Sequence, residues 1–364
     1  MKSNTLGLAV TAAALALVVS ACGGGSSSSS STSIAPAPSE SAVAAESAPA
    51  PSESAVAAES ATPEAQCTAP ADKKSVTFIS VGFANTYAAA TDEAAKKRAE
   101  ELNIDLTLLD SQFNAELQAQ QLAAAAASAP DGIIVWSADP KGIIPAAAAV
   151  SDAGIPLTFI NQDIDASGKQ YRLAFTGPDN YIQGKLQFDL MLKGLAERGI
   201  TDGIQYAAIR SFAGSGAQVE RQKGFEDQMA AAGPQLELLT EAYGESDVTK
   251  SRAVAAQILT KFGDQLDAIY AQDDNVAVGV AQAVKEAGLT DKIIIIGNGF
   301  SKQAEAAIKA GEMYGTLVQS PSLDGSYAVE TMAKILCGAK VEEIRNLPAP
   351  EVRGDNSSEF IAEW

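Results

Sequence analysis

The sequence of 364 residues contains no histidine. This removes the usual general base near neutral pH, the commonest neutral metal ligand, and the Ser-His and Cys-His nucleophile pairs. Only three cysteines occur, Cys22, Cys67 and Cys337, and they are too few and too scattered for a zinc cluster or an iron–sulfur site. We therefore predict no metal, no cofactor and no catalytic residue, and most hydrolase mechanisms are disfavoured.

Basic residues are also scarce. There are 26 Lys and Arg against 45 Asp and Glu, which gives a formal net charge of −19 at pH 7. Nucleic-acid binding depends on a cationic surface, so nucleic acid is not an expected partner. Apolar residues make up 46% of the chain, enough for a sizeable core, and the length fits two domains or one large domain.

Residues 1–21 have the layout of an export signal, with Lys2 at the start, an apolar run from residue 6 to 19, and small residues before Cys22. The run is short for a permanent helix through about 30 Å of hydrocarbon. The sequence Val19-Ser20-Ala21-Cys22 resembles a bacterial lipobox, which implies that Cys22 is acylated after cleavage. The alternative is an ordinary cleavage site that leaves a free thiol. We expect a lipoprotein, extracytoplasmic and anchored to the outer face of the cell membrane.

Residues 22–72 are rich in Gly, Ser, Ala, Pro and Glu and have almost no large apolar side chain. Residues 35–47 recur identically as residues 48–60, a duplication of 13 residues without a hydrophobic face. Such a segment cannot bury enough apolar surface to offset the entropy of ordering. It is predicted to be a disordered linker between the lipid anchor and the folded part.

From Lys73 onward, short apolar runs alternate with helical stretches, which is typical of consecutive βαβ units. The predicted strands are 76–81, 106–109, 132–136, 157–160, 172–175, 205–209, 236–239, 268–270, 293–296 and 315–318. The predicted helices are 88–103, 115–127, 143–153, 181–198, 218–232, 249–262, 276–287, 301–310 and 324–336, followed by a weakly apolar tail. Strand 293–296 is apolar on both faces, as a parallel sheet covered by helices requires. The predicted fold class is α/β with two doubly wound, Rossmann-like sheets.

In doubly wound sheets, ligands bind outside the carboxyl ends of the strands. The residues that follow the predicted strands are aromatic rings, amides and carboxylates, which suit a small polyhydroxylated ligand. The candidate ligand-binding residues are Phe83, Asn85, Tyr87, Trp136, Asn161, Gln162, Arg210, Asp273, Asn298 and Gln319.

Several of these residues also have a purely structural interpretation. Trp136 could fill the core under the next helix, Asn161 and Gln162 could cap a loop, and Arg210 could be paired at a strand end. Asp and Asn near residue 276 could cap the helix predicted to begin there. We expect Asp273 to contact ligand and the neighbouring Asp274 to cap the helix.

Five segments carry a family resemblance in unbroken order over about residues 76–344. They are Leu109-Asp110-Ser111-Gln112, Ala153-Gly154-Ile155-Pro156, the stretch 220–225, the stretch 271–279, and the stretch 308–319. Together they resemble the ribose-type periplasmic sugar-binding proteins, the substrate-capturing subunits of ABC importers. The resemblance implies a type I periplasmic-binding-protein fold with two lobes joined by three crossovers, near 176–179, 319–322 and 347–350. The N-terminal lobe would comprise 73–177 plus 320–347, and the C-terminal lobe 178–319 plus 348–364.

The resemblance also places the family's pocket positions on this sequence. The family's amides are kept at Asn85 and Gln319, whereas Asn161 and Gln162 replace a frequent Asp-Arg pair. The other positions are Val219, which is often Arg, Asp273, which is often Asn, and the stretch 298–299, which often contains Asp. These departures imply a ligand other than ribose itself.

The implied function is capture of a small neutral sugar or polyol between the two lobes for delivery to an ABC transporter permease, by a monomeric protein that is not an enzyme. One alternative is a sensory ligand-binding subunit of a membrane receptor, with a nucleoside or signalling molecule as ligand. Another is a glycosidase that uses two of the carboxylates Asp139, Asp163 and Asp273.

The resemblance further bears on Cys67 and Cys337. Cys67 precedes the first predicted strand and Cys337 follows the last predicted helix. In the resembled lobe both places lie away from the ligand cleft, and an exported protein can form disulfides. We expect a Cys67–Cys337 bridge. The alternative is two isolated cysteines, with Cys337 buried as a small hydrophobic residue.

Overall fold

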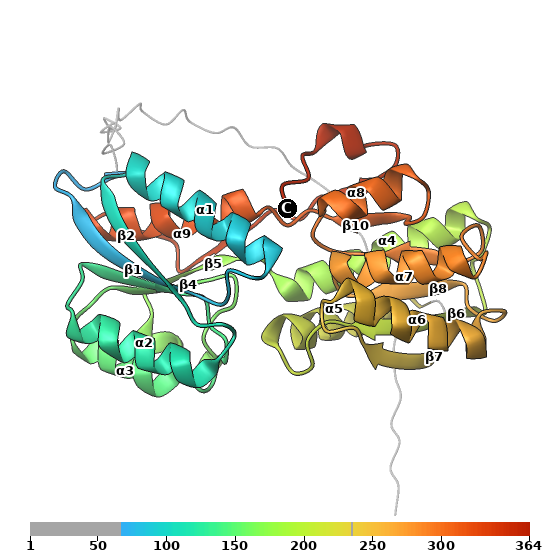
Figure 1. The fold of residues 1–364 in the computed structure, drawn as a ribbon, viewed down its shortest axis with the longest axis horizontal. Coiled ribbons are helices and arrows are strands. Elements are labelled where there is room, and N and C mark those ends of the chain that lie inside the picture. The colour runs from blue at the N-terminus through green and yellow to red at the C-terminus, as the bar shows by residue number, and fades with distance from the viewer. Residues whose placement is uncertain (1–66, 234–235) are drawn as a thin grey trace, which may run out of the picture. The chain divides into compact units, whose positions relative to one another are not determined.

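The computed structural model describes residues 67–233 and 236–364. The predicted signal peptide, the lipidation site Cys22 and the repeated linker segment lie outside these residues. Two lobes follow, each an α/β unit (Figure 1). The first lobe is built from β1 (Lys74–Ser80), α1 (Thr86–Glu101), β2 (Ile104–Asp110), α2 (Ala115–Ala127), β3 (Gly132–Val135), α3 (Ile144–Asp152), β4 (Leu157–Ile160), the 3-10 helix η1 (Ala166–Tyr171), β5 (Ala174–Gly177), α9 (Pro321–Leu336) and β11 (Ile344–Asn346).

The second lobe holds the remaining elements. These are α4 (Asn180–Glu197), β6 (Ile204–Arg210), α5 (Gly216–Ala232), β7 (Leu236–Tyr243), α6 (Val248–Phe262), β8 (Ala268–Ala271), α7 (Asp274–Glu286), β9 (Ile294–Ile296), α8 (Lys302–Lys309), β10 (Gly315–Leu317), β12 (Glu351–Arg353) and the 3-10 helix η2 (Ser357–Glu359).

The strand order is β11-β5-β4-β3-β1-β2 in the first sheet and β12-β10-β9-β8-β6-β7 in the second. All described pairings are parallel except that of β12 with β10. The chain passes between the sheets three times, from β5 to α4, from β10 to α9, and from β11 to β12. The predicted fold class of two doubly wound lobes with three crossovers is confirmed.

The structure corrects the sequence prediction at the edges of the sheets. The fifth strand begins at Ala174 rather than Arg172, because Arg172 points to Asp163 and Leu173 is exposed. Strands β11 and β12 lie in the tail for which no strand was predicted. Each has only three residues, so neither carries a periodicity that a sequence could reveal.

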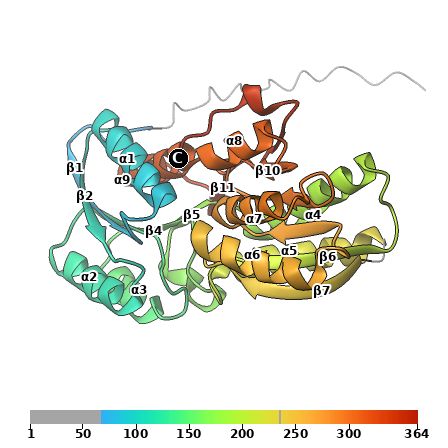
Figure 2. The same ribbon diagram turned by 45° about the vertical axis from the view of Figure 1, so that its right-hand side comes forward.

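Helices cover both faces of each sheet. In the first lobe, α1 and α9 pack side by side on one face, as Figures 1 and 2 show, and α2 and α3 cover the other. In the second lobe, α4 and α5 cover one face and α6, α7 and α8 the other. Because helices bury both faces, central strands such as Ile294–Ile296 are apolar throughout.

Two glycines let α4 and α5 approach closely. A Cβ atom on Gly184 would lie 2.0 Å from the Arg221 carbonyl oxygen, and one on Gly224 would lie 1.9 Å from the Tyr181 carbonyl oxygen. Any side chain at either glycine would therefore push the helices apart. This close packing holds Arg221 of α5 against the polar face of α4.

Residues 67–72, before the first strand, also contact the first lobe. Pro70 is buried, and the Asn103 Nδ2 donates to the Ala71 carbonyl at 3.1 Å. The structure joins Cys67 to Cys337 in a disulfide bond, with their Cα atoms 6.1 Å apart. The bridge therefore fastens the start of the first lobe to the end of α9.

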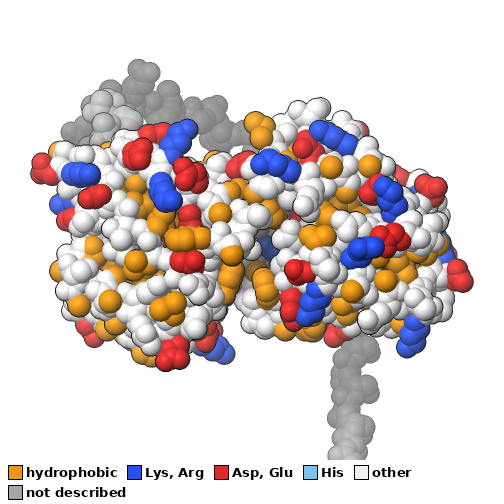
Figure 3. All heavy atoms as spheres, in the orientation of Figure 1, with side chains coloured by type: hydrophobic (Ala, Val, Ile, Leu, Met, Phe, Trp, Pro, Cys, Tyr) orange, Lys and Arg blue, Asp and Glu red, His pale blue; other side chains and the backbone are white. Residues whose placement is uncertain are grey.

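The surface carries charges of both signs. Figure 3 shows acidic and basic side chains interspersed with apolar ones on the face in view. Many of the ion pairs are exposed, such as Arg252 with Glu286, and such pairs add little stability. Among the residues that the structure describes, no helix is long and apolar enough to cross a membrane.

Candidate functional site

A cavity of about 150 Å³ lies at the carboxyl ends of strands from both sheets. Eight of the ten residues predicted from the sequence line it: Asn85, Tyr87, Trp136, Asn161, Gln162, Asp273, Asn298 and Gln319. Its other lining residues are Phe113, Ser211, Phe212, Ser215, Ala217, Arg221, Ser246, Asn275, Gly299 and Trp364. Side chains from both lobes thus converge on one small space.

Phe83 and Arg210 do not line this cavity. The Phe83 side chain is exposed, and Arg210 forms an ion pair with Glu241 of the neighbouring strand β7. Arg210 shares a face of β6 with Ala208, whose register partner is Glu241. The strand alternation therefore places the Arg210 guanidinium on the same face of the sheet as Glu241, and the structure does not bring Phe83 or Arg210 to the cavity with the other eight residues.

The second-lobe wall is a buried network of amides around one guanidinium. Arg221 donates to the Gln183 Oε1 at 3.2 Å, to the Gln272 carbonyl at 3.2 Å and to the Gln319 Oε1 at 3.0 Å. The Asn298 Nδ2 donates to the same Gln183 and Gln319 oxygens at 3.3 and 3.4 Å. Burial lowers the pKa of Arg221, whose three acceptors are all uncharged.

One atom of this wall has hydrogen-bonding capacity to spare. The Asn298 Oδ1 is buried and has no partner among the residues of the structure. A buried acceptor without a donor is unfavourable, and a ligand hydroxyl could satisfy it. This amide therefore marks the second-lobe wall as a place for a hydroxyl group.

Asp273 lines the cavity and also caps α7, the role predicted for Asp274, whereas Asp274 does neither. Asp273 is the N-cap of α7, since its Oδ1 accepts from the Val276 N–H at 2.9 Å, and its Oδ2 accepts from Ser246. Asp274 accepts from the Thr316 hydroxyl and the Ser301 N–H, each at 2.6 Å. Burial raises the pKa of Asp273, and it raises that of Asp274 to about 6. Capping is thus done by the residue that also lines the cavity.

The first-lobe wall centres on Asp324 of α9. Its Oδ2 accepts from the Tyr87 hydroxyl at 3.0 Å and from the Asn161 Nδ2 at 2.5 Å. Its Oδ1 is buried without a hydrogen-bond partner among the residues described. Because the carboxyl group is fully buried, its pKa is raised to about 7. Asp324, which does not line the cavity itself, thereby fixes the orientation of the lining side chains of Tyr87 and Asn161.

Aromatic rings form the rest of the lining. The Tyr87 ring meets Trp136 and Trp364 edge to face, with centroids 6.0 and 5.6 Å apart. Phe113 of the first lobe and Phe212 of the second have ring centroids 5.8 Å apart. Such rings offer flat apolar surfaces beside the polar groups, a combination typical of small-molecule sites.

Arg221 is the most important residue that the sequence analysis missed. The family position was assigned to Val219, which is 52% exposed, whereas Arg221 is 6% exposed and lines the cavity. Helical periodicity contained the signal, because Gln218, Arg221 and Phe225 lie three and four residues apart on the buried side of α5. The guanidinium thought to be absent from the site is therefore present.

The other missed residues carried weaker signals. Phe113 and Ser246 have positive φ angles of 52° and 50° and lie in loops. Trp364 reaches the cavity from a tail that is remote in sequence from every other lining residue. No local pattern marks a residue whose position depends on a distant segment.

A second, larger cavity of about 810 Å³ borders the first at Asn161, Gln162 and Ala217. It is lined by side chains of both charge signs. Asp139 and Asp163 line it, whereas Asp273 lines the smaller cavity, and Asp163 is engaged by Arg172 at 2.7 and 2.8 Å. The three carboxylates considered for glycoside hydrolysis are thus not gathered around the smaller cavity.

Within residues 67–233 and 236–364, no group of three or more Cys, Asp or Glu side chains is placed to hold a metal ion. The polar side-chain atoms of the smaller cavity instead belong to amides, hydroxyls, indoles, one guanidinium and one carboxylate, that of Asp273. This donor set is suited to directed hydrogen bonds with a neutral ligand.

The chain matches a known family model over residues 76–340, and that model describes a periplasmic binding protein domain. Among characterised proteins, it is 27% identical over 270 residues to the ribose import binding protein RbsB of Salmonella typhimurium, covering 74% of this chain and 87% of that protein. It is 25% identical over 281 residues to the fructose import binding protein FruE of Bifidobacterium longum, covering 76% of this chain and 83% of that protein.

Among solved structures, a Caulobacter myo-inositol binding protein bound to myo-inositol superposes with a TM-score of 0.72. The two are 27% identical, and the match covers 80% of this chain and 97% of that chain. A galactofuranose binding protein superposes equally well, with a TM-score of 0.72 at 23% identity over 79% of this chain and 96% of that chain. The latter likeness concerns the fold alone.

Proposed function

Because the chain belongs to the periplasmic binding protein domain family, we propose that it captures a small neutral sugar or polyol in the cavity of about 150 Å³. The observation that carries this proposal is the convergence of aromatic rings and buried amides from both lobes on that cavity. Its relatives include proteins named for ribose and fructose import and for myo-inositol binding. All three ligands are neutral and rich in hydroxyl groups.

The proposed binding chemistry divides between the two kinds of lining group. Aromatic rings such as Trp136 pack against the C–H surface of the ligand and contribute apolar contact area. Arg221, Asn298 and Asp273 form hydrogen bonds to hydroxyl groups at defined positions. A wrong epimer would leave one of these buried groups unpaired, at a cost of about 1 to 3 kcal/mol.

Two lobes and three connections suit binding by hinge closure. A ligand that contacts both lobes favours the closed arrangement by its differential affinity for the two arrangements. With an open-state preference of a few kcal/mol, a similar differential affinity is needed before closure dominates. The closed, loaded protein would then be the form that an ABC transporter permease accepts.

The sequence features outside residues 67–364 complete the proposal. The export signal and the lipobox-like stretch before Cys22 support an extracytoplasmic lipoprotein, and the composition of the linker supports a flexible tether. The family consists of substrate-binding proteins, and we propose capture and release without chemical conversion. In this arrangement a monomer anchored in the bilayer delivers its ligand to a permease in the same membrane.

A thermal-shift panel of monosaccharides, polyols and nucleosides tests the proposed function. A ligand that binds only the native state at 100 times its Kd stabilises it by about 2.7 kcal/mol, so a sugar or polyol should raise the Tm. Asn298→Ala should reduce this shift, whereas Arg210→Gln, outside the cavity, should retain it. A shift produced by nucleosides alone, or by no compound of the panel, would overturn the proposal.

A further inference from the structure

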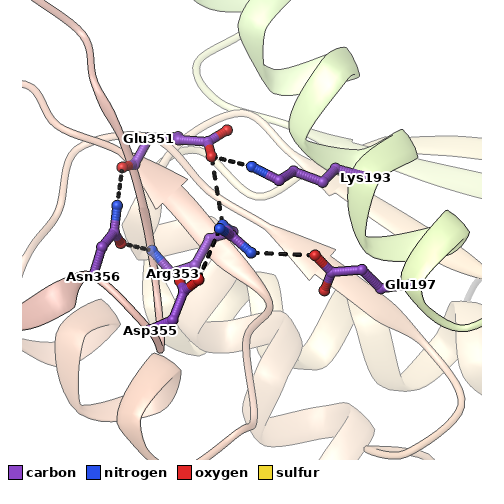
Figure 4. Close-up of polar contacts among 6 residues, drawn as sticks. All are labelled: Lys193, Glu197, Glu351, Arg353, Asp355 and Asn356. Atoms are coloured by element: carbon purple, nitrogen blue, oxygen red, sulfur yellow. Dashed lines mark hydrogen bonds and ion pairs between the residues drawn. The ribbon is translucent and has the colours of Figure 1, made fainter.

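The segment that follows β12 is fastened to the second lobe at its start. Arg353 pairs with Glu197 of α4 at 3.2 Å, and Glu351 pairs with Lys193 of the same helix (Figure 4). Asn356 closes the turn, because its Nδ2 donates to the Glu351 carbonyl at 3.0 Å and its Oδ1 accepts from the Arg353 N–H at 2.7 Å. These contacts fix the direction in which the chain continues.

The next residues of the segment are also held by the second lobe. Phe360 and Ala362 pack in a small apolar cluster with Phe300, and the two phenylalanine rings meet edge to face at 6.3 Å. The Lys302 N–H at the start of α8 donates to the Trp364 carbonyl at 2.7 Å. The backbone is thereby anchored as far as residue 364.

The side chains of Glu363 and Trp364 turn to the first lobe. The Glu363 carboxylate accepts from the Ser320 hydroxyl at 2.7 Å and from the Ser322 N–H at 2.9 Å, at the start of α9. The Trp364 indole packs against the first-lobe core and lies edge to face with Tyr87. We call residues 360–364 the strap, because it is bound to both lobes.

The strap also requires a glycine opposite it. A Cβ atom on Gly299 would lie 2.7 Å from the Trp364 ring, and Gly299 has a φ angle of +140°, which favours glycine. Both residues line the smaller cavity. The indole therefore fits closely against the second lobe as well as the first.

The single polar atom of the indole makes no hydrogen bond within the described residues. The Trp364 Nε1 is buried and has no hydrogen-bond partner among the described residues. Indole N–H groups are donors that usually find an acceptor when buried. A ligand hydroxyl in the adjoining cavity would be such an acceptor.

We propose that Trp364 is a ligand-contacting and specificity-determining residue, held between the lobes by the strap. This inference rests on the proposed function, since the ligand it contacts is the captured sugar or polyol. The ring adds an apolar surface to those of Trp136, Phe113 and Phe212, which follow the strands. Because the strap binds both lobes, contact of Trp364 with ligand also couples binding to the hinge.

The chain offers a direct test, because Trp136 and Trp364 are its two tryptophans and both line the cavity. In Trp136→Phe, all indole emission comes from Trp364. The probe is the sugar or polyol that gives the largest thermal shift with the wild-type protein. Its addition should change the emission of Trp136→Phe in a saturable way, with the same midpoint as the thermal titration of that variant.

Calorimetric titration of the same compound provides the second readout. Trp364→Ala should raise the Kd at least about tenfold, and Trp364→Phe, which keeps a ring but lacks the N–H donor, should raise it less. Ile361→Ala is the matched control, because this strap residue is 82% exposed, and its Kd should be unchanged. The emission readout does not depend on how well Trp364→Ala folds.

The outcomes separate the two proposals. If the wild-type protein responds to no sugar or polyol, the proposed function itself is overturned. A wild-type protein that binds, while Trp364→Ala keeps the same Kd and the Trp364 emission stays unchanged, overturns the role of Trp364 alone. Equal losses in Ile361→Ala and Trp364→Ala would also overturn it, since the effect would then belong to the strap backbone.

Discussion

The two walls of the cavity are built from different chemistry. The first-lobe wall combines the rings of Tyr87, Phe113 and Trp136 with three amides, and behind it lies Asp324, a carboxyl group whose pKa is raised to about 7 by burial. The second-lobe wall consists of amides arranged around Arg221. Apolar contact is tolerant of small changes in a ligand, whereas hydrogen bonds are directional. The comparison implies that the first lobe supplies contact area and the second selects among isomers.

The largest effect is expected from the first-lobe wall. Trp136→Ala removes a side chain that is only 7% exposed and that packs on Tyr87. The substitution should lower the free energy of unfolding by about 3 to 5 kcal/mol. It should also raise the Kd of every sugar in the panel by a similar factor. Denaturant unfolding and calorimetry measure the two effects. A variant that changed the order of preference among epimers would contradict the assigned division of roles.

The disulfide provides a second contrast between the lobes. Among the described residues, it joins the segment before β1 to the end of α9, and both belong to the first lobe. The bridge closes a loop with a sequence separation of 270, and its removal typically costs about 2 to 4 kcal/mol. The double variant Cys67→Ser and Cys337→Ser should lose this much stability and keep its sugar affinity. Thiol titration in denaturant without reductant should leave Cys67 and Cys337 unreactive; two additional reactive thiols would refute the bridge.

The sequence predicted the central parts of both lobes because their signals are local. Apolar runs and helical periodicity identify elements whose residues contact one another over short distances. Strands Ile344–Asn346 and Glu351–Arg353 were missed because each is defined only by pairing with a remote strand. The boundary of β5 was misplaced because Arg172, next to it, is buried by an ion pair rather than by strand pairing.

The candidate site was predictable to the extent that it follows strand ends. Asn161, Asn298 and Gln319 were chosen by that rule and line the cavity. The rule selects positions but not directions, which is why Arg210 was chosen although its side chain pairs with Glu241. Residues that reach the cavity from elsewhere lie beyond any such rule, since only the tertiary fold brings them there.

A smaller effect on stability, but a sharper one on selectivity, is expected from the second-lobe wall. Arg221→Met removes three hydrogen bonds while keeping much of the buried volume, at an expected cost of about 2 kcal/mol. The ratio of Kd values between two epimers should change, unlike in Trp136→Ala. Calorimetry with a matched pair of epimers measures this ratio. An unchanged ratio would remove the contrast between the two walls.

The last expected effect concerns the pH dependence of stability and separates the charge of Asp324 from its hydrogen bonds. An ordinary Asp has a pKa of 3.8, and in the folded protein that of Asp324 is raised to about 7, chiefly by burial. A raised carboxyl pKa means that the unfolded state releases its proton first as pH rises. The folded state therefore loses stability progressively between about pH 4 and pH 7, and the loss levels off above the folded pKa.

Asp324→Asn tests this directly, because an amide oxygen can still accept from Tyr87 and Asn161 but carries no titrating proton. The unfolding free energy of the variant relative to wild type should rise by about 3 to 4 kcal/mol from pH 4 to pH 8, measured by urea unfolding. Asp131→Asn is the control of opposite sign, since a backbone hydrogen bond from Ser75 lowers the pKa of Asp131. A difference for Asp324→Asn that stays flat over this range would show that the carboxyl group is not held neutral behind the aromatic wall. The first-lobe wall would then be as polar as the second, and the contrast between the walls would have to be drawn from the rings alone.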